Sequence, residues 1–374
     1  MTEPQEPPAT LQDTVLRLAE EAGFAHAGIA PAGDLAESAY LEEWVERGHA
    51  GEMEYLKRRD AEGELVRSSL RSVAPWARSV VVCAAPYQAA APRSIDPSPA
   101  GSGWIARYAW SGTPDASGQL RPADYHKVLL ARLRQLEAAL QARLGSFTSW
   151  AYVDTGPLIE RAWAERAGVG WTAKNTCTIR RDLGSFFFLG VILTSLEVPG
   201  EALAAIAPDR CGSCTRCIDA CPTQALVEPY RMDASRCISY LTIEKRGAIP
   251  TELREGMGRQ VFGCDICQDV CPWNRKAPIA ADPSMQPRAE LINPSLAWLA
   301  ALSEAEYAGL FHGSPVKRAK IAGLRRNVAI AMGNSGDPGF AEQLQAWARE
   351  DDAVVAEAAV WALAQLETHR SVTG

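Results

Sequence analysis

Residues 211–222 have the sequence CGSCTRCIDACP, with gaps of two, two and three residues between the cysteines and a proline after the last one. Bacterial ferredoxins bind 4Fe-4S clusters with this run. A second group, CDICQDVCP at residues 264–272, lacks one cysteine of the run. Cys237 lies between the two groups and brings the number of cysteines in this region to eight. The pattern predicts two 4Fe-4S clusters.

The cysteines can be divided between the clusters by one rule. In two-cluster ferredoxins the fourth cysteine of a run binds the other cluster. The first cluster is therefore expected to bind Cys211, Cys214, Cys217 and Cys271. The second is expected to bind Cys264, Cys267 and Cys221, with Cys237 completing it. A pair of zinc sites is the main alternative, but zinc requires neither the three-residue gap nor the two Cys-Pro pairs. Disulfides are a weaker alternative in a chain without a secretion signal.

Composition favours a soluble globular protein. The chain has 374 residues and 47% hydrophobic content, enough for two or three domains. The longest apolar run, Phe186–Leu193, suits a buried strand and is too short for a membrane span. The segment Met1–Thr10 is expected to be disordered and has no features of an export signal, which indicates a cytoplasmic protein without a membrane partner. A net charge of −7 argues against indiscriminate coating of nucleic acid.

Apolar spacing predicts the elements of the first 200 residues. Helices are expected over residues 11–22, 35–47, 129–144 and 158–167, and strands over 79–85 and 185–194, with a strand ending at 152–154. Cys83 would be a small core residue in the first strand, and Cys177 is expected to be buried and inert. Residues 89–121 are rich in Pro, Gly and Ser and are interpreted as two flexible loops around an ordered piece at 104–110. Alternating strands and helices indicate an α/β sheet domain.

The C-terminal region contains a short repeat. Residues 324–334 match residues 355–365 in apolar pattern at an offset of 31, a period that suits paired helices of the HEAT type. A basic cluster, formed by Lys317, Arg318, Lys320, Arg325 and Arg326, would contact phosphate or else form a solvated helix face. The predicted domains are a disordered 1–10, an α/β (α+β) domain at 11–200, a ferredoxin-like two-cluster domain at 201–290 and a helical HEAT-like repeat at 291–374.

Outside the cysteines, two polar segments are candidates for chemistry. Asp154 follows a strand and precedes a helix, and open α/β sheets bind their ligands at the carboxyl ends of strands. There it would be a proton donor or simply a helix cap. Lys174, Asn175 and Thr176 form a polar turn that would bind a ligand or lie at the surface. No phosphate-binding loop and no dinucleotide fingerprint occur. His126 begins a D-x-H-x-x-G corrinoid motif, but Leu129 replaces its glycine, so a histidine ligand to cobalt is not indicated.

Taken together, these segments resemble the epoxyqueuosine reductase family. The resemblance extends from about residue 11 into the C-terminal tail. It rests on MEYLKR at 53–58, RYA at 107–109, DYHK at 124–127, DTGPL at 154–158, AERAG at 164–168, AKN at 173–175, RCISYLT at 236–242 and CPWN at 271–274. The sequence departs from the family at Ser111–Pro122, an insertion expected to bulge into solvent, and after Arg58.

The resemblance implies a cobalamin enzyme with two 4Fe-4S clusters that reduces epoxyqueuosine to queuosine at the wobble position of tRNA. It implies that Asp154 is the proton donor and that the corrin is held by residues of both the α/β domain and the cluster domain. The expected corrin contacts are Arg58, Tyr108, Asp154, Lys174, Asn175, Glu244, Cys264, Asp265, Ile266 and Cys267. Expected partners are tRNA and a flavodoxin- or ferredoxin-like electron donor, and the chain is expected to be monomeric. The alternatives are a reductive dehalogenase-like enzyme and a ferredoxin-type electron-transfer module.

Overall fold

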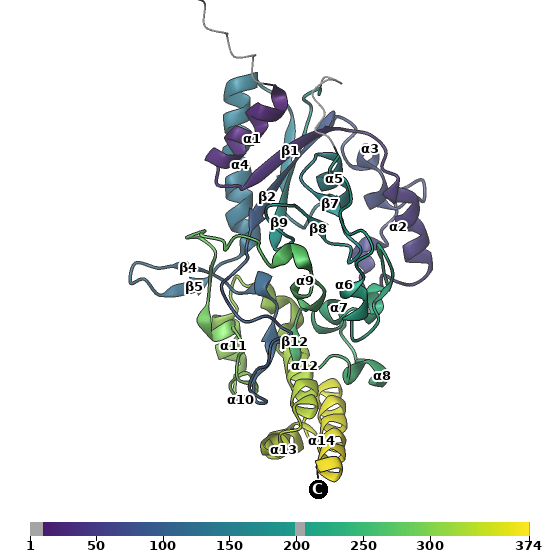
Figure 1. Ribbon diagram of the computed structural model, residues 1–374, viewed down its shortest axis with the longest axis vertical. Helices are drawn as coiled ribbons and strands as arrows, with labels where there is room; N and C mark the ends of the chain where they lie inside the picture. The colour runs from purple at the N-terminus through teal and green to yellow at the C-terminus, as the bar shows by residue number, and fades with distance from the viewer. Residues whose placement is uncertain (1–9, 199–205, 374) are drawn as a thin grey trace, which may run out of the picture. The chain divides into compact units, whose positions relative to one another are not determined.

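A computed structural model describes residues 10–198 and 206–373, which form two compact units (Figure 1). Within these residues, the first unit takes those up to Arg47, Glu54–Pro86 and His126–Ser213. The second takes Gly48–Met53, Tyr87–Tyr125 and the residues from Cys214 onward. The three-domain division stays a prediction, and most of the expected disordered start lies outside the described residues. Thr10 itself caps the first helix, because its hydroxyl accepts a hydrogen bond from the Asp13 amide.

The first unit is built on a four-stranded sheet in the order β1-β2-β9-β6. Its strands are β1 (His26–Pro31), β2 (Ser79–Pro86), β6 (Ser149–Tyr152) and β9 (Phe187–Thr194). All neighbouring pairs are antiparallel. The unit also contains α1 (Leu11–Glu21), α2 (Glu37–Glu46), α3 (Leu70–Val73), α4 (Tyr125–Leu144), α5 (Glu160–Arg166), β7 (Trp171–Thr172) and β8 (Thr178–Ile179). Helix α4 belongs to this unit from His126 onward.

The antiparallel order corrects one expectation. Alternating strands and helices suggested an open sheet with ligands gathered at the carboxyl ends of its strands. Neighbouring antiparallel strands end at opposite edges of the sheet, so that rule does not place a ligand after β6. The position of Asp154 is therefore set by the turn that follows β6, and not by the edge of a parallel sheet.

Helices cover both faces of this sheet (Figure 1), so the apolar strands β2 and β9 are buried, as their sequences predicted. On one face, Val80 and Val82 of β2 share a hydrophobic core with Trp163 of α5. On the other, Gly190 of β9 lies against Leu133 of α4. Figure 1 shows α4 and α5 on opposite sides of the sheet. The long helix predicted at 129–144 is confirmed, and it ends before a glycine in the left-handed conformation, Gly145.

The second unit has small sheets and many short helices. Its strands are β3 (Trp104–Ile105), β4 (Ser111–Pro114), β5 (Leu120–Pro122), β10 (Leu226–Glu228), β11 (Arg231–Met232), β12 (Gln260–Phe262) and β13 (Gln286–Pro287). Its helices are α6 (Arg216–Asp219), α7 (Ile238–Ile243), α8 (Thr251–Arg254), α9 (Ile266–Asp269), α10 (Leu296–Ala300), α11 (Glu304–Leu310), α12 (Lys320–Ser335), α13 (Ala341–Trp347) and α14 (Ala353–Thr373). No described helix is both long enough and apolar enough to span a bilayer.

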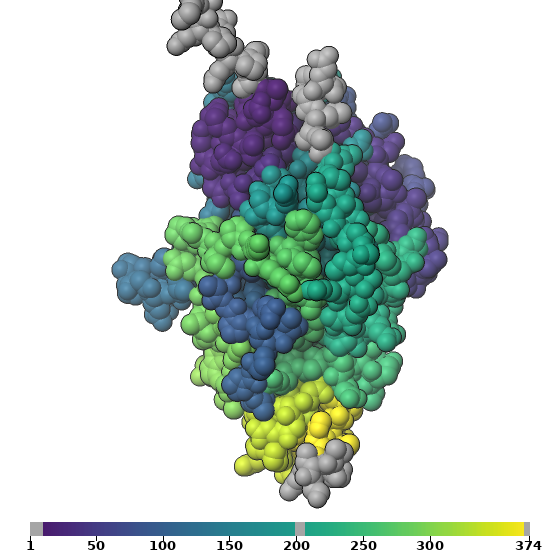
Figure 2. Space-filling view, in the orientation of Figure 1, coloured from purple at the N-terminus to yellow at the C-terminus, as the bar shows by residue number. Residues whose placement is uncertain are grey.

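The insertion at Ser111–Pro122 is a β-hairpin rather than an irregular loop. Strands β4 and β5 pair with each other, and β4 also pairs with β13. The Asp115 carboxylate closes the turn by accepting hydrogen bonds from the Ser117 and Gln119 amides. The tip is exposed, as expected for an insertion that extends into solvent, and it forms the blue projection at the left of Figure 2.

The two copies of the C-terminal repeat lie on helices that pack together. Residues 324–334 belong to α12 and residues 355–365 to α14. Gly333 allows the close approach, because a Cβ there would lie 2.8 Å from the Ala362 Cα. Paired helices therefore follow from the repeat, while their HEAT-type classification stays a prediction.

The basic cluster is only partly available to a ligand. Lys317, Arg318 and Lys320 are exposed, but Arg326 is 1% exposed. The Arg326 guanidinium donates hydrogen bonds to three main-chain carbonyls, those of Leu241 (2.7 Å), Lys245 (2.8 Å) and Gly247 (2.7 Å). Burial lowers its pKa to about 10, which leaves it charged at neutral pH. Arg326 is therefore a structural residue and not a phosphate contact.

Arg326→Ala is expected to destabilise the second unit strongly. The substitution leaves three carbonyls without their donor, and each buried unsatisfied group costs about 1–3 kcal/mol. Thermal unfolding followed by circular dichroism should show a clear fall in the midpoint, whereas Lys320→Ala, at an exposed position of the same cluster, should change little. An unchanged midpoint for Arg326→Ala would contradict this structural role.

Candidate cluster-binding segment and active site

Two short helices of the second unit carry cysteines of the two groups. Cys217 lies in α6 and Cys267 in α9, and these helices pack against each other. Cys271 is buried and immediately precedes a 3-10 turn that starts with Pro272. The two cysteine groups, about 50 residues apart in the chain, are thus brought together as in a two-cluster ferredoxin.

Three of the four cysteines expected for the second cluster lie close together. Cys264 is half-buried, and the pKa of its thiol is raised well above the usual range by burial and then by the nearby Cys237. Cys221 contributes in the same direction, so its thiol is also near. Cys237 comes directly before α7, far from both groups in the sequence. This proximity supports the assignment of Cys237 as the ligand that completes the set.

Cys211 belongs to the first unit, where Lys174 holds the next residue of the chain. The Lys174 ammonium donates a hydrogen bond to the Gly212 carbonyl at 2.6 Å. Lys174 and Asn175 are buried, with 9% and 3% exposure. The turn is therefore not a surface turn, and one function of Lys174 is to fix the start of the first cysteine group.

The thiols are not arranged around a single ion. Within residues 10–198 and 206–373, no group of three or more His, Cys, Asp or Glu side chains is positioned to bind one metal ion. A 4Fe-4S cluster requires a different arrangement. Each of its four thiolates binds a separate iron, so the four cysteine sulfurs surround the whole cluster and not one ion.

The other two cysteines, Cys83 and Cys177, are not among the expected cluster ligands. Cys83 is fully buried in β2, and burial raises its thiol pKa, as expected for an inert core residue. Cys177 was expected to be buried as well, but it is only half-buried. It follows the Asn175 turn, where its amide donates to the Asn175 side chain at 3.2 Å.

Asp154 occupies a tight turn between β6 and α5. Its φ is +58°, in the left-handed region, which Asp tolerates better than most residues. Gly156 allows the chain to turn back over β6, because a Cβ at this position would lie 1.8 Å from the Tyr152 ring. The Asp154 side chain is 58% exposed, so it is available to a ligand. A simple helix cap is not observed, since α5 begins at Glu160 and has no side-chain cap.

His126 lies beside this carboxyl. Its Nε2 is 3.9 Å from the Asp154 Oδ2. The sequence indicated no role for His126 as a cobalt ligand, and its position beside Asp154 was not predicted. The only sequence signal for this proximity was that the DYH segment at 124–126 and the DTGP segment at 154–157 both belong to the stretches that resemble the family.

Glu160 was missed by sequence reasoning. It is the first residue of α5, where an acidic side chain is common and favourable. Its Oε1 atom is buried and accepts no hydrogen bond within the described residues. Burial raises the pKa of Glu160 to about 8, with a further contribution from Asp154, so the group is mostly neutral at pH 7.

This raised pKa predicts a pH-dependent stability. The folded protein binds the Glu160 proton more tightly than the unfolded chain, so the free energy of unfolding should fall by a few kcal/mol as the pH rises from about 4.5 to about 8. Glu160→Gln removes this contribution. The difference in stability between the variant and the wild type should therefore favour the variant more at pH 8.5 than at pH 5.5. Thermal unfolding of both proteins at the two pH values measures this difference. Parallel pH profiles would contradict the buried, neutral state.

The remaining predicted corrin contacts divide between the units. Arg58 is exposed in the first unit. In the second, the half-buried Tyr108 ring lies 6.3 Å from Tyr125 and 6.0 Å from Phe262, measured between ring centroids. Ile266 and Cys267 lie in α9, directly after the buried Asp265.

Two predicted carboxylates have partners within their own unit. Glu244 forms an ion pair with Arg318 at 2.5 Å. Asp265 accepts hydrogen bonds from the Arg107 amide (2.8 Å) and the Trp104 indole (3.3 Å). Burial and the neighbouring Asp269 raise the pKa of Asp265, while the Arg107 guanidinium opposes this rise. Both side chains therefore already have polar partners in the second unit.

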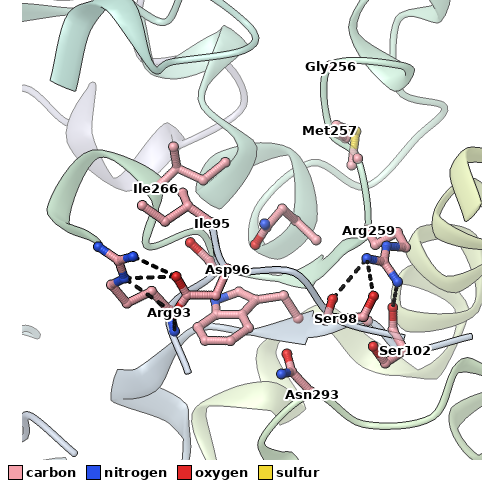
Figure 3. A pocket seen from close by; sticks show the side chains of 15 residues that line it. Arg93, Ile95, Asp96, Ser98, Ser102, Gly256, Met257, Arg259, Ile266 and Asn293 are labelled. Carbon is pink, nitrogen blue, oxygen red and sulfur yellow. Dashed lines mark hydrogen bonds and ion pairs between the residues drawn. The ribbon is translucent and has the colours of Figure 1, made fainter. Parts of the chain in front are cut away.

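A separate cavity of about 230 Å³ lies in the second unit (Figure 3). Arg259 donates hydrogen bonds to the Ser98 hydroxyl and the Ser102 carbonyl on one side, and Arg93 pairs with Asp96 on the other. Of the predicted site residues, only Ile266 lines it. Both Arg93 and Arg259 are thus already engaged in hydrogen bonds or ion pairs with neighbouring residues.

Comparison with known proteins agrees with this geometry. The model of a 4Fe-4S double cluster binding domain matches residues 210–274, and the model described as Epoxyqueuosine reductase QueG, DUF1730 matches residues 67–155. The paired cysteine helices and the first of these matches define the class, a two-cluster iron–sulfur protein.

Relatives identify the family. An epoxyqueuosine reductase of Pseudomonas aeruginosa is 40% identical over 339 residues, which is 88% of this chain and 86% of that protein. One from Xanthomonas campestris is 38% identical, over 93% of this chain and 94% of the other. This chain belongs to the epoxyqueuosine reductase family and is an oxidoreductase.

Solved structures extend the comparison to the fold. An epoxyqueuosine reductase crystallised with an epoxyqueuosine-modified tRNA-Tyr stem loop has 30% identity and a TM-score of 0.81, and the match covers 95% of this chain and 90% of that one. A Bacillus subtilis epoxyqueuosine reductase, described with its catalytic aspartate loop swung out of the active site, has 29% identity and a TM-score of 0.72. That match covers 95% of this chain and 99% of the other.

Proposed function

We propose that this chain reduces epoxyqueuosine in tRNA to queuosine, with two 4Fe-4S clusters and a cobalamin as cofactors. The observation that carries the proposal is the eight-cysteine set, three of whose members, Cys221, Cys237 and Cys264, approach one another. Family membership and the tRNA complex of a relative support the substrate.

The donor set fits the cofactors. Eight cysteines are the number that two Cys₄ clusters require. The half-buried Tyr108 ring, set against Tyr125 and Phe262, offers an apolar face suited to a flat macrocycle. Tyr108 is accordingly proposed as a corrin contact. Family membership also supports, as proposed contacts, Arg58, Asp154, Lys174, Asn175, Glu244 and residues 264–267.

The reaction breaks two carbon–oxygen bonds of the epoxide and forms one carbon–carbon double bond. It consumes two electrons and two protons, and the oxygen leaves as water. When bound, the clusters and the corrin supply the electrons one at a time. Asp154 supplies a proton to the departing oxygen, because its carboxyl is exposed on a turn whose backbone is fixed on both sides. A catalytic aspartate loop is described for the Bacillus subtilis relative, which supports this assignment.

The exposed part of the basic cluster suits a phosphate backbone. Lys317 and Lys320 are exposed, in contrast to the buried Arg326. We assign these two lysines as contacts to tRNA. A flavodoxin- or ferredoxin-like donor, a monomeric state and a cytoplasmic location complete the proposal.

Anaerobic reconstitution tests the proposal. The visible absorption of cluster-loaded protein should change when cobalamin is added, and the loaded protein should convert epoxyqueuosine-containing tRNA under a chemical reductant. The same tRNA without the epoxide is the control. A ferredoxin-type module would bind no corrin, and a dehalogenase-like enzyme would leave the tRNA unchanged while releasing halide from an organohalide.

A further inference from the structure

Arg107 contacts both acidic residues of the second cysteine group, residues 264–272. It lies in a 3-10 turn and is 3% exposed. Its guanidinium donates a hydrogen bond to the Asp269 carboxylate at 2.7 Å, and its backbone amide donates one to the Asp265 carboxyl at 2.8 Å. Helix α9 begins directly after Asp265 and ends at Asp269. A residue more than 150 positions away in the sequence thus holds both ends of the helix that carries Cys267.

The guanidinium of Arg107 is itself held from several sides. Its second terminal nitrogen donates a hydrogen bond to the Pro92 carbonyl at 3.0 Å. Its central carbon lies 5.5 Å from the centre of the Trp104 ring and 5.4 Å from that of Trp110, within the range of a cation–π interaction. Arg107 is therefore fixed in position before any cluster binds, and α9 is fixed with it.

This buried group brings charge close to the cysteines. The Arg107 guanidinium lies 2.7 Å from the Asp269 carboxylate and 3.7 Å from that of Asp265. The second oxygen of Asp269 accepts hydrogen bonds from the amide and the hydroxyl of Ser94, each at 2.7 Å. One cation thus faces two acidic groups next to cysteines. Buried charges are screened by solvent much less than exposed ones, so each of them should act on a neighbouring cluster.

We infer that Arg107 is a positioning residue for the second cysteine group, and that its charge raises the reduction potential of the cluster that Cys264 and Cys267 bind. This inference rests on the two clusters of the proposed function. Net charge, hydrogen bonds and solvent exposure set the potential of such a cluster. A cluster gains one negative charge when it accepts one electron from the donor. A nearby cation therefore stabilises the reduced form, and nearby carboxylates destabilise it.

Two neutral substitutions should shift the potential in opposite directions. Arg107→Gln removes the cation, whereas Asp269→Asn removes an anion and keeps an acceptor oxygen for Arg107. At a fixed applied potential, the ratio of reduced to oxidised cluster should fall about three- to tenfold in Arg107→Gln and rise by a similar factor in Asp269→Asn. A tenfold change in this ratio corresponds to about 59 mV for one electron. Proton exchange by the remaining carboxyls would reduce these shifts without reversing their sign.

Redox titration followed by electron paramagnetic resonance measures both ratios. The protein is reconstituted without oxygen, and about eight irons per chain are verified first. Arg288→Gln is the matched control, because Arg288 is a 1% exposed arginine of the same unit that donates to the Leu310 carbonyl at 3.1 Å. Its loss should lower stability but leave the ratio within about twofold of the wild type. Arg107→Lys keeps the charge, so its ratio should lie closer to the wild type than that of Arg107→Gln.

Opposite shifts in the two variants would support the inference, because a general loosening of the fold cannot raise the potential in one and lower it in the other. Shifts of the same sign, or unchanged potentials in both, would overturn it. If Arg107→Gln does not retain its clusters, Asp269→Asn decides alone, and a potential that is unchanged or lowered there would overturn the inference. A wild-type protein that binds no clusters would instead overturn the proposed function itself.

Discussion

Asp154→Asn is expected to lower kcat by about 100- to 10,000-fold, the usual contribution of a positioned general acid. Asparagine adopts the left-handed conformation about as readily as aspartate, so the turn at φ +58° should survive. The amide cannot deliver the carboxyl proton to the departing oxygen. Binding of tRNA and both cofactors should remain, and KM should change little. Single-turnover conversion of epoxyqueuosine-containing tRNA, with quantified clusters and corrin, measures this directly.

Alanine at the same position provides a second test. Asp154→Ala removes the acid and also disfavours the left-handed backbone, so it should be at least as inactive and somewhat less stable. Asp182→Asn is the matched control, because Asp182 is a 65% exposed aspartate in the same unit and contacts Arg180. Turnover near the wild-type rate in Asp154→Asn would remove this residue from the chemistry.

Cys237→Ala should disrupt one cluster and stop turnover. The two clusters together contain about eight irons, and removal of a ligand of the second should reduce iron to about four, or to about seven if a three-iron cluster survives. Electron transfer should then fail even though the other cluster is intact. Iron analysis and electron paramagnetic resonance of dithionite-reduced protein, prepared without oxygen, report both outcomes.

Cys177→Ala is the control for this experiment. Cys177 is half-buried like Cys237, but it is not one of the eight cysteines expected to bind the clusters. It should keep about eight irons and full activity. A Cys237→Ala protein with the full iron content and normal turnover would show that another residue completes the second cluster.

The strongest local patterns predicted the fold best. The leucine spacing of α4 and the valine run of β2 specify a helix and a strand by themselves, because their apolar residues recur at a fixed period. The cysteine spacing likewise anticipated which distant thiols approach Cys264. For the helix and the strand the information lies in neighbouring residues, whereas the cysteine assignment follows from the ferredoxin rule and the number of ligands required.

Features that depend on distant contacts were not predictable. The direction of each strand in the first sheet depends on which strand it pairs with, and the alternation of strands and helices does not reveal this. The β4–β5 hairpin was hidden by its Pro, Gly and Ser residues, which are typical of loops. Glu160 looked like an ordinary first-turn acid, because only the folded chain buries its carboxyl group near Asp154.

Asn327 in α12 donates to the carbonyls of Thr242 and Val261, at 2.9 Å each. The Thr242 hydroxyl in turn accepts the amide of Gly263, the residue before Cys264. The last helices are consequently not a detachable module. A shortened protein cut before α12 would be a poor source of a free-standing electron carrier, because the loop that presents Cys264 would lose its scaffold and the exposed core would promote aggregation.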